Sequence, residues 1–140
     1  RHTYDNIIAS ESYTINSIHA SFIDKAHYTS AKFSVDESEF EKCNLEAQYL
    51  NEFNAPFVKA SKLKMALKLQ EVVDIKINSC KLIIGSIEHL HVDQEAIEEN
   101  GQVNLQKLDT VAIGGLNSYY ALNQIGHFPY ARTSELPDFD

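Results

Sequence analysis

The chain has 140 residues, of which 44% are hydrophobic and 23% charged, and these proportions predict one globular domain over 1–140 with a sizeable core. Its formal net charge of -8 argues against a nucleic-acid partner, because phosphate backbones are bound by clustered lysine and arginine. The two cysteines, Cys43 and Cys80, lie far apart and outside any C-x-x-C pair, which favours a reducing, cytoplasmic setting. No apolar run approaches the length of a membrane span.

The first half of the chain alternates short helices with extended segments. A helix is predicted over 3–9 with Thr3 at its N-cap, because a threonine hydroxyl accepts hydrogen bonds from first-turn amides. A strand rich in β-branched and aromatic residues follows at 13–18. Short helices are expected at 21–31 and at 38–43, the second ended by Asn44. Pro56 makes 55–58 an extended linker.

The clearest pattern lies in the middle of the chain. Between 62 and 70, leucines and a methionine alternate with lysines, which predicts a half-buried strand with its lysines on a solvated face. The alternation slips at 72–73, where we expect a β-bulge. A turn at 78–80 leads into a second strand at 81–92, and the two strands form a long antiparallel hairpin. Gly85 lies inside that second strand, where a bend at a barrel corner is a usual cause.

The last third is less regular. Residues 94–100 predict a short acidic helix or turn, and 103–108 a last piece of extended chain that leads into Gly114 and Gly115. Long strands with short helices between them favour a mainly β fold, a barrel with helical inserts, over a stack of βαβ units.

Four histidines are candidates for chemical roles. His89 and His91, with Asp93, share one face of the predicted strand and could converge on a metal ion. No third His or Cys stands at ligand spacing, so a solvated or interface-lining face is favoured and we expect no metal. His19 and His27 flank a helix start, where surface or capping roles are usual.

The glycine pair and the aromatic residues near the C-terminus do not specify a site. Gly114 and Gly115 lack the G-x-G-x-x-G pattern, so a dinucleotide-binding turn is not supported, and a tight backbone turn is the simpler interpretation. The aromatic residues predict core or dimer-interface packing, which we favour over direct stacking on a ligand; they are Tyr119, Tyr120, Phe128 and Tyr130.

The N-terminus is the sharper candidate. Arg1 lies two residues before Thr3 at the start of a predicted helix. A cation, a hydroxyl and free backbone amides would then meet at one helix end, which is what a phosphate dianion requires. The alternative is an ordinary capped helix with a frayed end.

Motifs along nearly the whole chain, in the same order, resemble those of the flavin reductase-like, FMN-binding split-barrel family. Residues 1–7 resemble the family's Lys/Arg-Asp-Thr-x-x-Asn-Ile stretch, except that His2 stands where the family usually has Asp. Further similar segments follow in register; they are 13–18 with Asn16, 29–31, 38–40, 44–45, 55–56 with Ser61, 83–85 and 114–132.

The resemblance implies a split β-barrel of the Greek-key type that forms a homodimer, with FMN near the dimer interface. The family's first strands have no counterpart before Arg1, so we expect an N-terminally truncated chain that lacks them. Arg1 and Thr3 would hold the FMN phosphate, and Thr29 and Ser30 would stand at the pocket rim. No catalytic residue can be assigned by position.

The resemblance also implies an activity. Relatives pass hydride from NADH or NADPH to flavin, so a flavin reductase-type oxidoreductase is the leading hypothesis, with flavin and nicotinamide as its small-molecule partners. Two alternatives stay open: a non-catalytic flavin-binding or electron-transfer module, and a dimeric interaction barrel that has lost its ligand.

Overall fold

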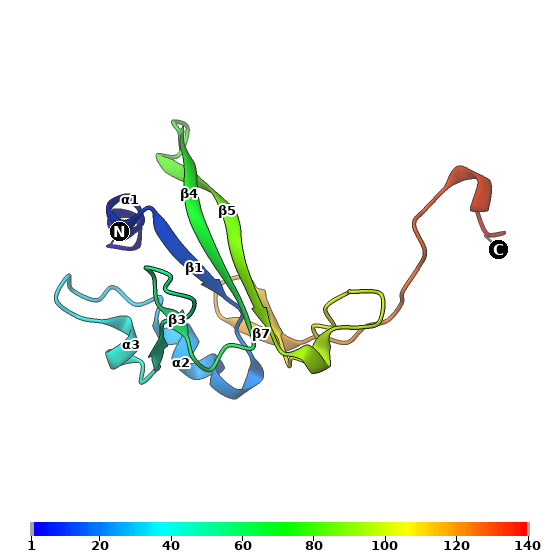
Figure 1. Ribbon diagram of the computed structural model, residues 1–140, viewed down its shortest axis with the longest axis horizontal. Coiled ribbons are helices and arrows are strands. Elements are labelled where there is room, and N and C mark those ends of the chain that lie inside the picture. The colour runs from blue at the N-terminus through cyan, green and yellow to red at the C-terminus, as the bar shows by residue number, and fades with distance from the viewer. Residues whose placement is uncertain (1, 140) are drawn as a thin grey trace.

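The computed structural model describes residues 2–139, and its centre is a long antiparallel hairpin (Figure 1). The hairpin consists of β4 (Leu63–Ile75) and β5 (Cys80–Val92), and β1 (Ser12–Asn16) pairs with the first half of β4. The sheet order is therefore β1-β4-β5. Two short antiparallel pairs accompany this sheet: β2 (Ala47–Gln48) with β3 (Phe57–Val58), and β6 (Val111–Gly114) with β7 (Ser118–Ala121).

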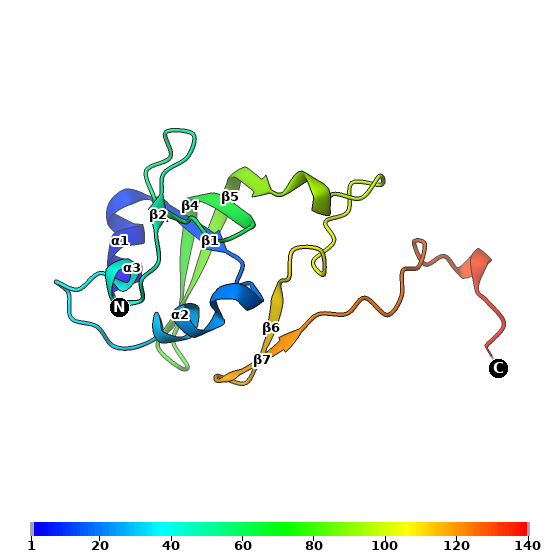
Figure 2. The same cartoon turned by 90° about the horizontal axis from the view of Figure 1, so that it is seen from below.

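Short helices fill the connections. Three are α-helices and three are 3-10 turns; they are α1 (His2–Ser10), α2 (Ile23–Tyr28), α3 (Glu39–Lys42), η1 (Ala20–Phe22), η2 (Gln94–Ala96) and η3 (Thr133–Glu135). The mainly β class is confirmed, with 34% of residues in strands against 20% in helices. Helices α1 and α3 gather beside β1 with the β2–β3 pair, whereas the chain after β7 runs out from the other side (Figure 1, Figure 2).

The predicted hairpin is confirmed, with its bulge displaced. Gln70 is left over between the pairs Leu69–Gly85 and Glu71–Ile84, so the bulge on β4 lies two residues before the slip in the sequence pattern. Glu88 is left over in the same way on β5. An extra residue moves the side chains that follow it to the opposite faces of the sheet. The sequence alternation therefore changes only after the bulge, farther along the chain.

The lysine face of β4 is exposed at Lys68, as predicted, but it is covered at Lys64, where the prediction is wrong. Its side chain is buried, and its Nζ donates hydrogen bonds to Gln48 Oε1 at 2.9 Å and to the Lys59 carbonyl oxygen at 3.2 Å. The β2–β3 pair supplies these partners because it covers this face of the sheet. The expected linker at 55–58 is thus partly a strand. Burial lowers the pKa of the Lys64 ammonium, and Asp93 opposes that shift.

The opposite, apolar face is the more open one. Register places its side chains in two rows across β1, β4 and β5; the rows are Ile15, Met65 and Leu90, and Tyr13, Leu67 and Ile87. Ile15, Ile87 and Leu90 are 45%, 59% and 53% exposed. We call these two rows the apolar sheet face.

The largest fully buried side chains are Phe57, Leu108 and His19. His19 Nε2 accepts a hydrogen bond of 2.8 Å from the Lys62 amide, and its backbone forms a β-bridge with Thr110. His19 is therefore a core residue, which corrects its predicted surface or capping role. The predicted extended chain at 103–108 is also wrong, because this segment turns back at 105–109 to bury Leu108.

The β6–β7 hairpin was not predicted, although the glycine pair was expected to turn. Gly115 has φ +63°, a left-handed conformation that glycine adopts without strain, and it opens the turn between the strands. Within residues 2–139, no helix is long and apolar enough to cross a membrane.

Candidate functional site

Helix α1 is held against the sheet. Its residue Ile7 is buried, and Lys81 Nζ on β5 lies 5.4 Å from the centre of the Tyr4 ring. Glu11, with φ +54°, ends the helix and accepts a hydrogen bond from the Leu69 amide at 2.8 Å. The helix already includes His2, so Thr3 lies in its first turn and not at the N-cap, which corrects the prediction.

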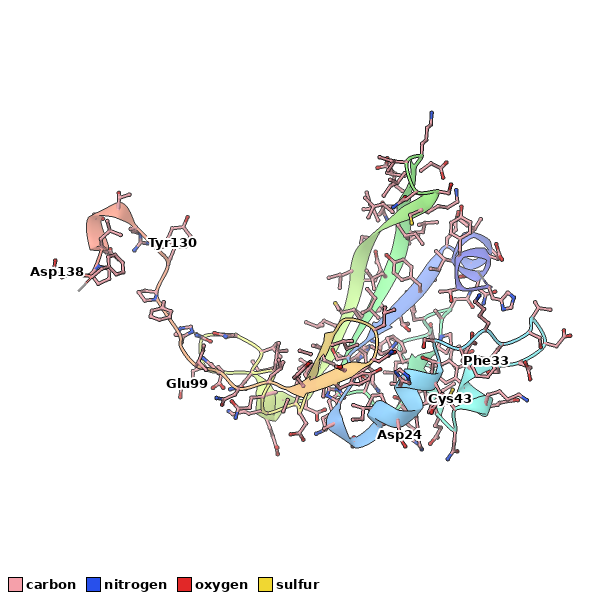
Figure 3. All side chains as sticks on the ribbon, turned by 180° about the vertical axis from the view of Figure 1, so that it is seen from behind. Asp24, Phe33, Cys43, Glu99, Tyr130 and Asp138 are labelled. Atoms are coloured by element: carbon pink, nitrogen blue, oxygen red, sulfur yellow. The ribbon has the colours of Figure 1, made fainter. Side chains whose placement is uncertain are left out.

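A hollow of about 170 Å³ opens at this first turn. Thr3 and Thr29 both line it, so the structure brings together two of the predicted site residues. Lys32, which no sequence motif indicated, adds an ammonium group. The complete lining is His2, Thr3, Thr29, Ala31, Lys32, Phe33 and Glu39. Phe33 lies in the loop beside α1 (Figure 3).

The hydroxyls of Thr29 and Ser30 are already engaged. Thr29 Oγ1 donates to the Ala26 carbonyl oxygen at 2.7 Å, and Ser30 Oγ donates to the His27 carbonyl oxygen at 2.8 Å. Ser30 is exposed and is not part of the hollow's lining. The groups suited to an anion are therefore the Thr3 hydroxyl, the Lys32 ammonium and the amides of the first helical turn, which have no partner within the helix.

A larger groove of about 520 Å³ begins on the other side of Thr3. Its volume lies within the range of about 300–1,000 Å³ that is usual for small-molecule sites. Helix α1, strand β1 and the segment 54–56 line it; the residues are Thr3, Asn6, Ile7, Ala9, Ser10, Ser12, Tyr13, Thr14, Asn54, Ala55 and Pro56.

One wall of this groove is fixed by side-chain hydrogen bonds from β1. Thr14 Oγ1 donates to the Pro56 carbonyl oxygen at 2.6 Å, and Asn16 Nδ2 donates to Thr14 Oγ1 at 2.9 Å. Asn16 Oδ1 accepts a hydrogen bond from the Val58 amide at 3.0 Å. Asn16 therefore holds β3 against β1, which gives a structural role to an asparagine that stood out in the sequence.

The remaining candidates lie elsewhere. Arg1 is outside the described residues. His89 and His91 pack in an aromatic cluster with Phe53 and Phe57, and the ring centres of His91 and Phe57 are 5.3 Å apart. Burial, with the nearby His89 and Lys64 charges, lowers the pKa of His91. Over residues 2–139, no group of three or more His, Cys, Asp or Glu side chains could hold a metal ion.

The aromatic residues near the C-terminus do not form a core cluster, which corrects that half of the prediction. Tyr119 Oη lies 3.1 Å from His27 Nδ1, so the β6–β7 hairpin is joined to α2. Phe128 and Tyr130 are more than four-fifths exposed, and Tyr130 stands well away from the sheets (Figure 3).

Comparison with known proteins adds a family to this geometry. Residues 1–109, more than half of the chain, match the family described as the flavin reductase like domain. A protein of Shewanella frigidimarina NCIMB 400, assigned as a flavin reductase with a split barrel domain, superimposes with a TM-score of 0.91 at 45% sequence identity. That match covers 94% of this chain and 66% of the other.

Two further relatives are more distant. The flavoredoxin of Desulfovibrio vulgaris (Miyazaki F) superimposes with a TM-score of 0.80 at 21% identity, over 96% of this chain and 70% of the other, and this likeness bears on the fold alone. An uncharacterized protein of Aquifex aeolicus (strain VF5) is 25% identical over 124 residues, which are 89% of this chain and 61% of that protein.

The chain thus spans 66% of the Shewanella protein and 61% of the Aquifex protein. The resemblance inferred from short motifs is confirmed, and so is the fold class. The chain belongs to the flavin reductase-like family, and its fold is that of the family's split-barrel proteins.

Proposed function

We propose that this protein binds FMN, with the phosphate in the hollow at the first turn of α1 and the ring system in the adjoining groove. The observation that carries the proposal is the position of Thr3, which lines both spaces. An anionic group in the hollow would meet the Thr3 hydroxyl, the Lys32 ammonium and free helix amides. Arg1 directly precedes this helix and is proposed as a second cation.

The proposed activity is that of a flavin reductase-type oxidoreductase that uses NADH or NADPH. Bound FMN would supply the hydride and electron chemistry, while the protein binds and orients it. Thr14 and Asn16 contribute by fixing the groove wall through the hydrogen bonds described above. No general base is needed for such a transfer, so no catalytic side chain is assigned. We also propose a cytoplasmic homodimer.

A titration tests the phosphate assignment. FMN fluorescence quenching should show binding, and Thr3→Val or Lys32→Ala should each weaken it by about 1.5–3 kcal/mol, the value of a hydrogen bond to a charged group. Lys76→Ala is the matched control, because Lys76 is an exposed lysine in the β4–β5 turn, outside both linings. If the full chain shows no FMN binding, the proposal is wrong. If both site variants bind FMN with unchanged affinity, the phosphate does not lie in this hollow.

Turnover separates reductase from carrier. Steady-state oxidation of NADH or NADPH in the presence of excess free flavin is expected for a reductase. Tight FMN binding without such oxidation would favour the electron-transfer module. A protein that neither binds FMN nor oxidises NADH or NADPH would favour the interaction barrel that has lost its ligand.

A further inference from the structure

The Lys32 ammonium lines the hollow at the first turn of α1, but side-chain packing does not fix its position, because Lys32 is exposed. Its backbone lies in the middle of the span 31–33, and every residue of that span lines the hollow. At one end the span is joined to α2, since the Ala31 amide donates a hydrogen bond to the Tyr28 carbonyl oxygen at 3.1 Å. The position of Lys32 therefore depends on what holds the other end.

Glu37 holds that other end. Its Oε2 accepts hydrogen bonds from the backbone amide and from the hydroxyl of Ser34, both at 3.0 Å. Its Oε1 forms an ion pair of 2.9 Å with Lys42 Nζ on α3. The Lys42 ammonium, followed by the two Ser34 donors, lowers the pKa of Glu37 to about 2, so this carboxylate is charged at neutral pH. We call Glu37, Ser34 and Lys42 the Glu37 clamp.

The Glu37 clamp connects two walls of the same hollow. On one side, Phe33 directly precedes Ser34 and lies in the loop beside α1 (Figure 3). On the other side, α3 supplies Glu39 to the lining. Helix α3 is itself anchored, because Cys43, the residue that ends it, is buried. The clamp therefore ties the loop that carries Lys32 to a fixed helix.

We propose that Glu37 is a positioning residue for the FMN phosphate, and that it acts by holding Lys32 at the hollow before the ligand arrives. The inference rests on the proposed function. An exposed ion pair contributes little by itself, but here a single carboxylate joins two segments through three contacts. Ordering one long side chain in advance is worth a factor of about two to ten in affinity.

Glu37→Gln separates positioning from charge. Glutamine has almost the same size, but its amide nitrogen only donates, so it cannot accept hydrogen bonds from both sides. The variant removes one negative charge, and the overall field alone would then bind an anion more tightly. Loss of the clamp should instead weaken FMN about two- to tenfold in a fluorescence titration. The sign of the change therefore decides between the two effects.

Two controls accompany this titration. Glu41→Gln makes the same charge change at an exposed position of α3, outside the clamp and the hollow, and should leave FMN affinity within about twofold. Riboflavin has the same ring system without the phosphate, so its affinity should be equal in Glu37→Gln and in the unaltered chain. An equal loss of FMN and riboflavin affinity would show a merely structural role and overturn the inference.

A double-mutant cycle with Lys32→Ala tests the route. If Glu37 acts through Lys32, Glu37→Gln should no longer weaken FMN once Lys32 is replaced. Equal weakening in both backgrounds would overturn the inference, and so would an FMN affinity that Glu37→Gln leaves unchanged or raises. In these cases the unaltered chain still binds FMN and the proposed function stands. An unaltered chain that binds no FMN would overturn the proposed function, and this inference with it.

Discussion

Gly85 permits a close approach of the Tyr13 ring, and replacing it with alanine should disturb Tyr13. A Cβ built on Gly85 would collide with the Tyr13 hydroxyl and lie 2.9 Å from Tyr13 Cζ and 3.1 Å from the Lys68 carbonyl oxygen. Tyr13 is half-buried and lines the groove, so its ring has little room to move. The Tyr13 ring that lies over Gly85 is therefore a second reason for a glycine here, beside the bend that the sequence predicts.

The size of the effect follows from two opposing terms. Overpacking of this kind costs about 1–3 kcal/mol. Replacing glycine by alanine stabilises the folded state by about 0.4–1 kcal/mol, because the unfolded chain loses freedom. Gly85→Ala should therefore lower the free energy of unfolding by up to about 2.6 kcal/mol. In a Tyr13→Leu background the ring collision is gone, and the same substitution should leave stability unchanged or raise it by up to about 1 kcal/mol.

Urea unfolding of the four proteins in this double-mutant cycle measures the difference. Gly114→Ala is the control, since a Cβ there would lie 2.7 Å from Tyr120 Cε2. Tyr120 is exposed and can swing into solvent, so that collision should cost little. Equal destabilisation by Gly85→Ala with and without Tyr13 would refute the reasoning.

Two further predictions concern charge. Burial lowers the pKa of His19 below its usual value of 6.5, so below that pH the unfolded chain takes up a proton that the folded chain refuses, and stability falls. Between pH 7.5 and 5.5, His19→Gln should reduce the slope of the free energy of unfolding against pH by up to about 1.4 kcal/mol per pH unit. His91, whose pKa is also lowered, supplies the loss of stability that remains. Equal slopes in the variant and the parent protein would contradict this. Glu39 lines the proposed phosphate hollow, so Glu39→Gln should tighten FMN about two- to fivefold at low salt, and unchanged affinity there would count against the hollow.

Regular strand pattern made most of the sheet predictable. The alternation in 62–70 and the strand at 81–92 were sufficient for the hairpin, because period two is a property of the backbone itself. Which face is covered was not predictable. Lys64 is buried by the β2–β3 pair, whose two-residue strands are too short to leave a pattern. His19 was missed for a related reason: its burial depends on the turn at 105–109, far along the chain.

The site was predictable only in part. Thr3 and Thr29 could be proposed from motifs that resemble a known family, and the structure places both at one hollow. Lys32 could not, because an exposed lysine in an irregular loop has no periodic or capping signature. Its position three residues after Thr29, inside the segment that closes on α1, is the signal that would have pointed to it.

Tyr13 connects the groove to the sheet. Its side chain lines the groove and also belongs to the apolar sheet face, in the row with Leu67 and Ile87. A side chain that is held by the sheet before a ligand arrives loses less conformational freedom on binding, so Tyr13 would border the proposed flavin ring system in a preorganised position. In a chain of net charge -8, where the overall field repels an anion, such restraint of the groove would add affinity that charge alone does not provide.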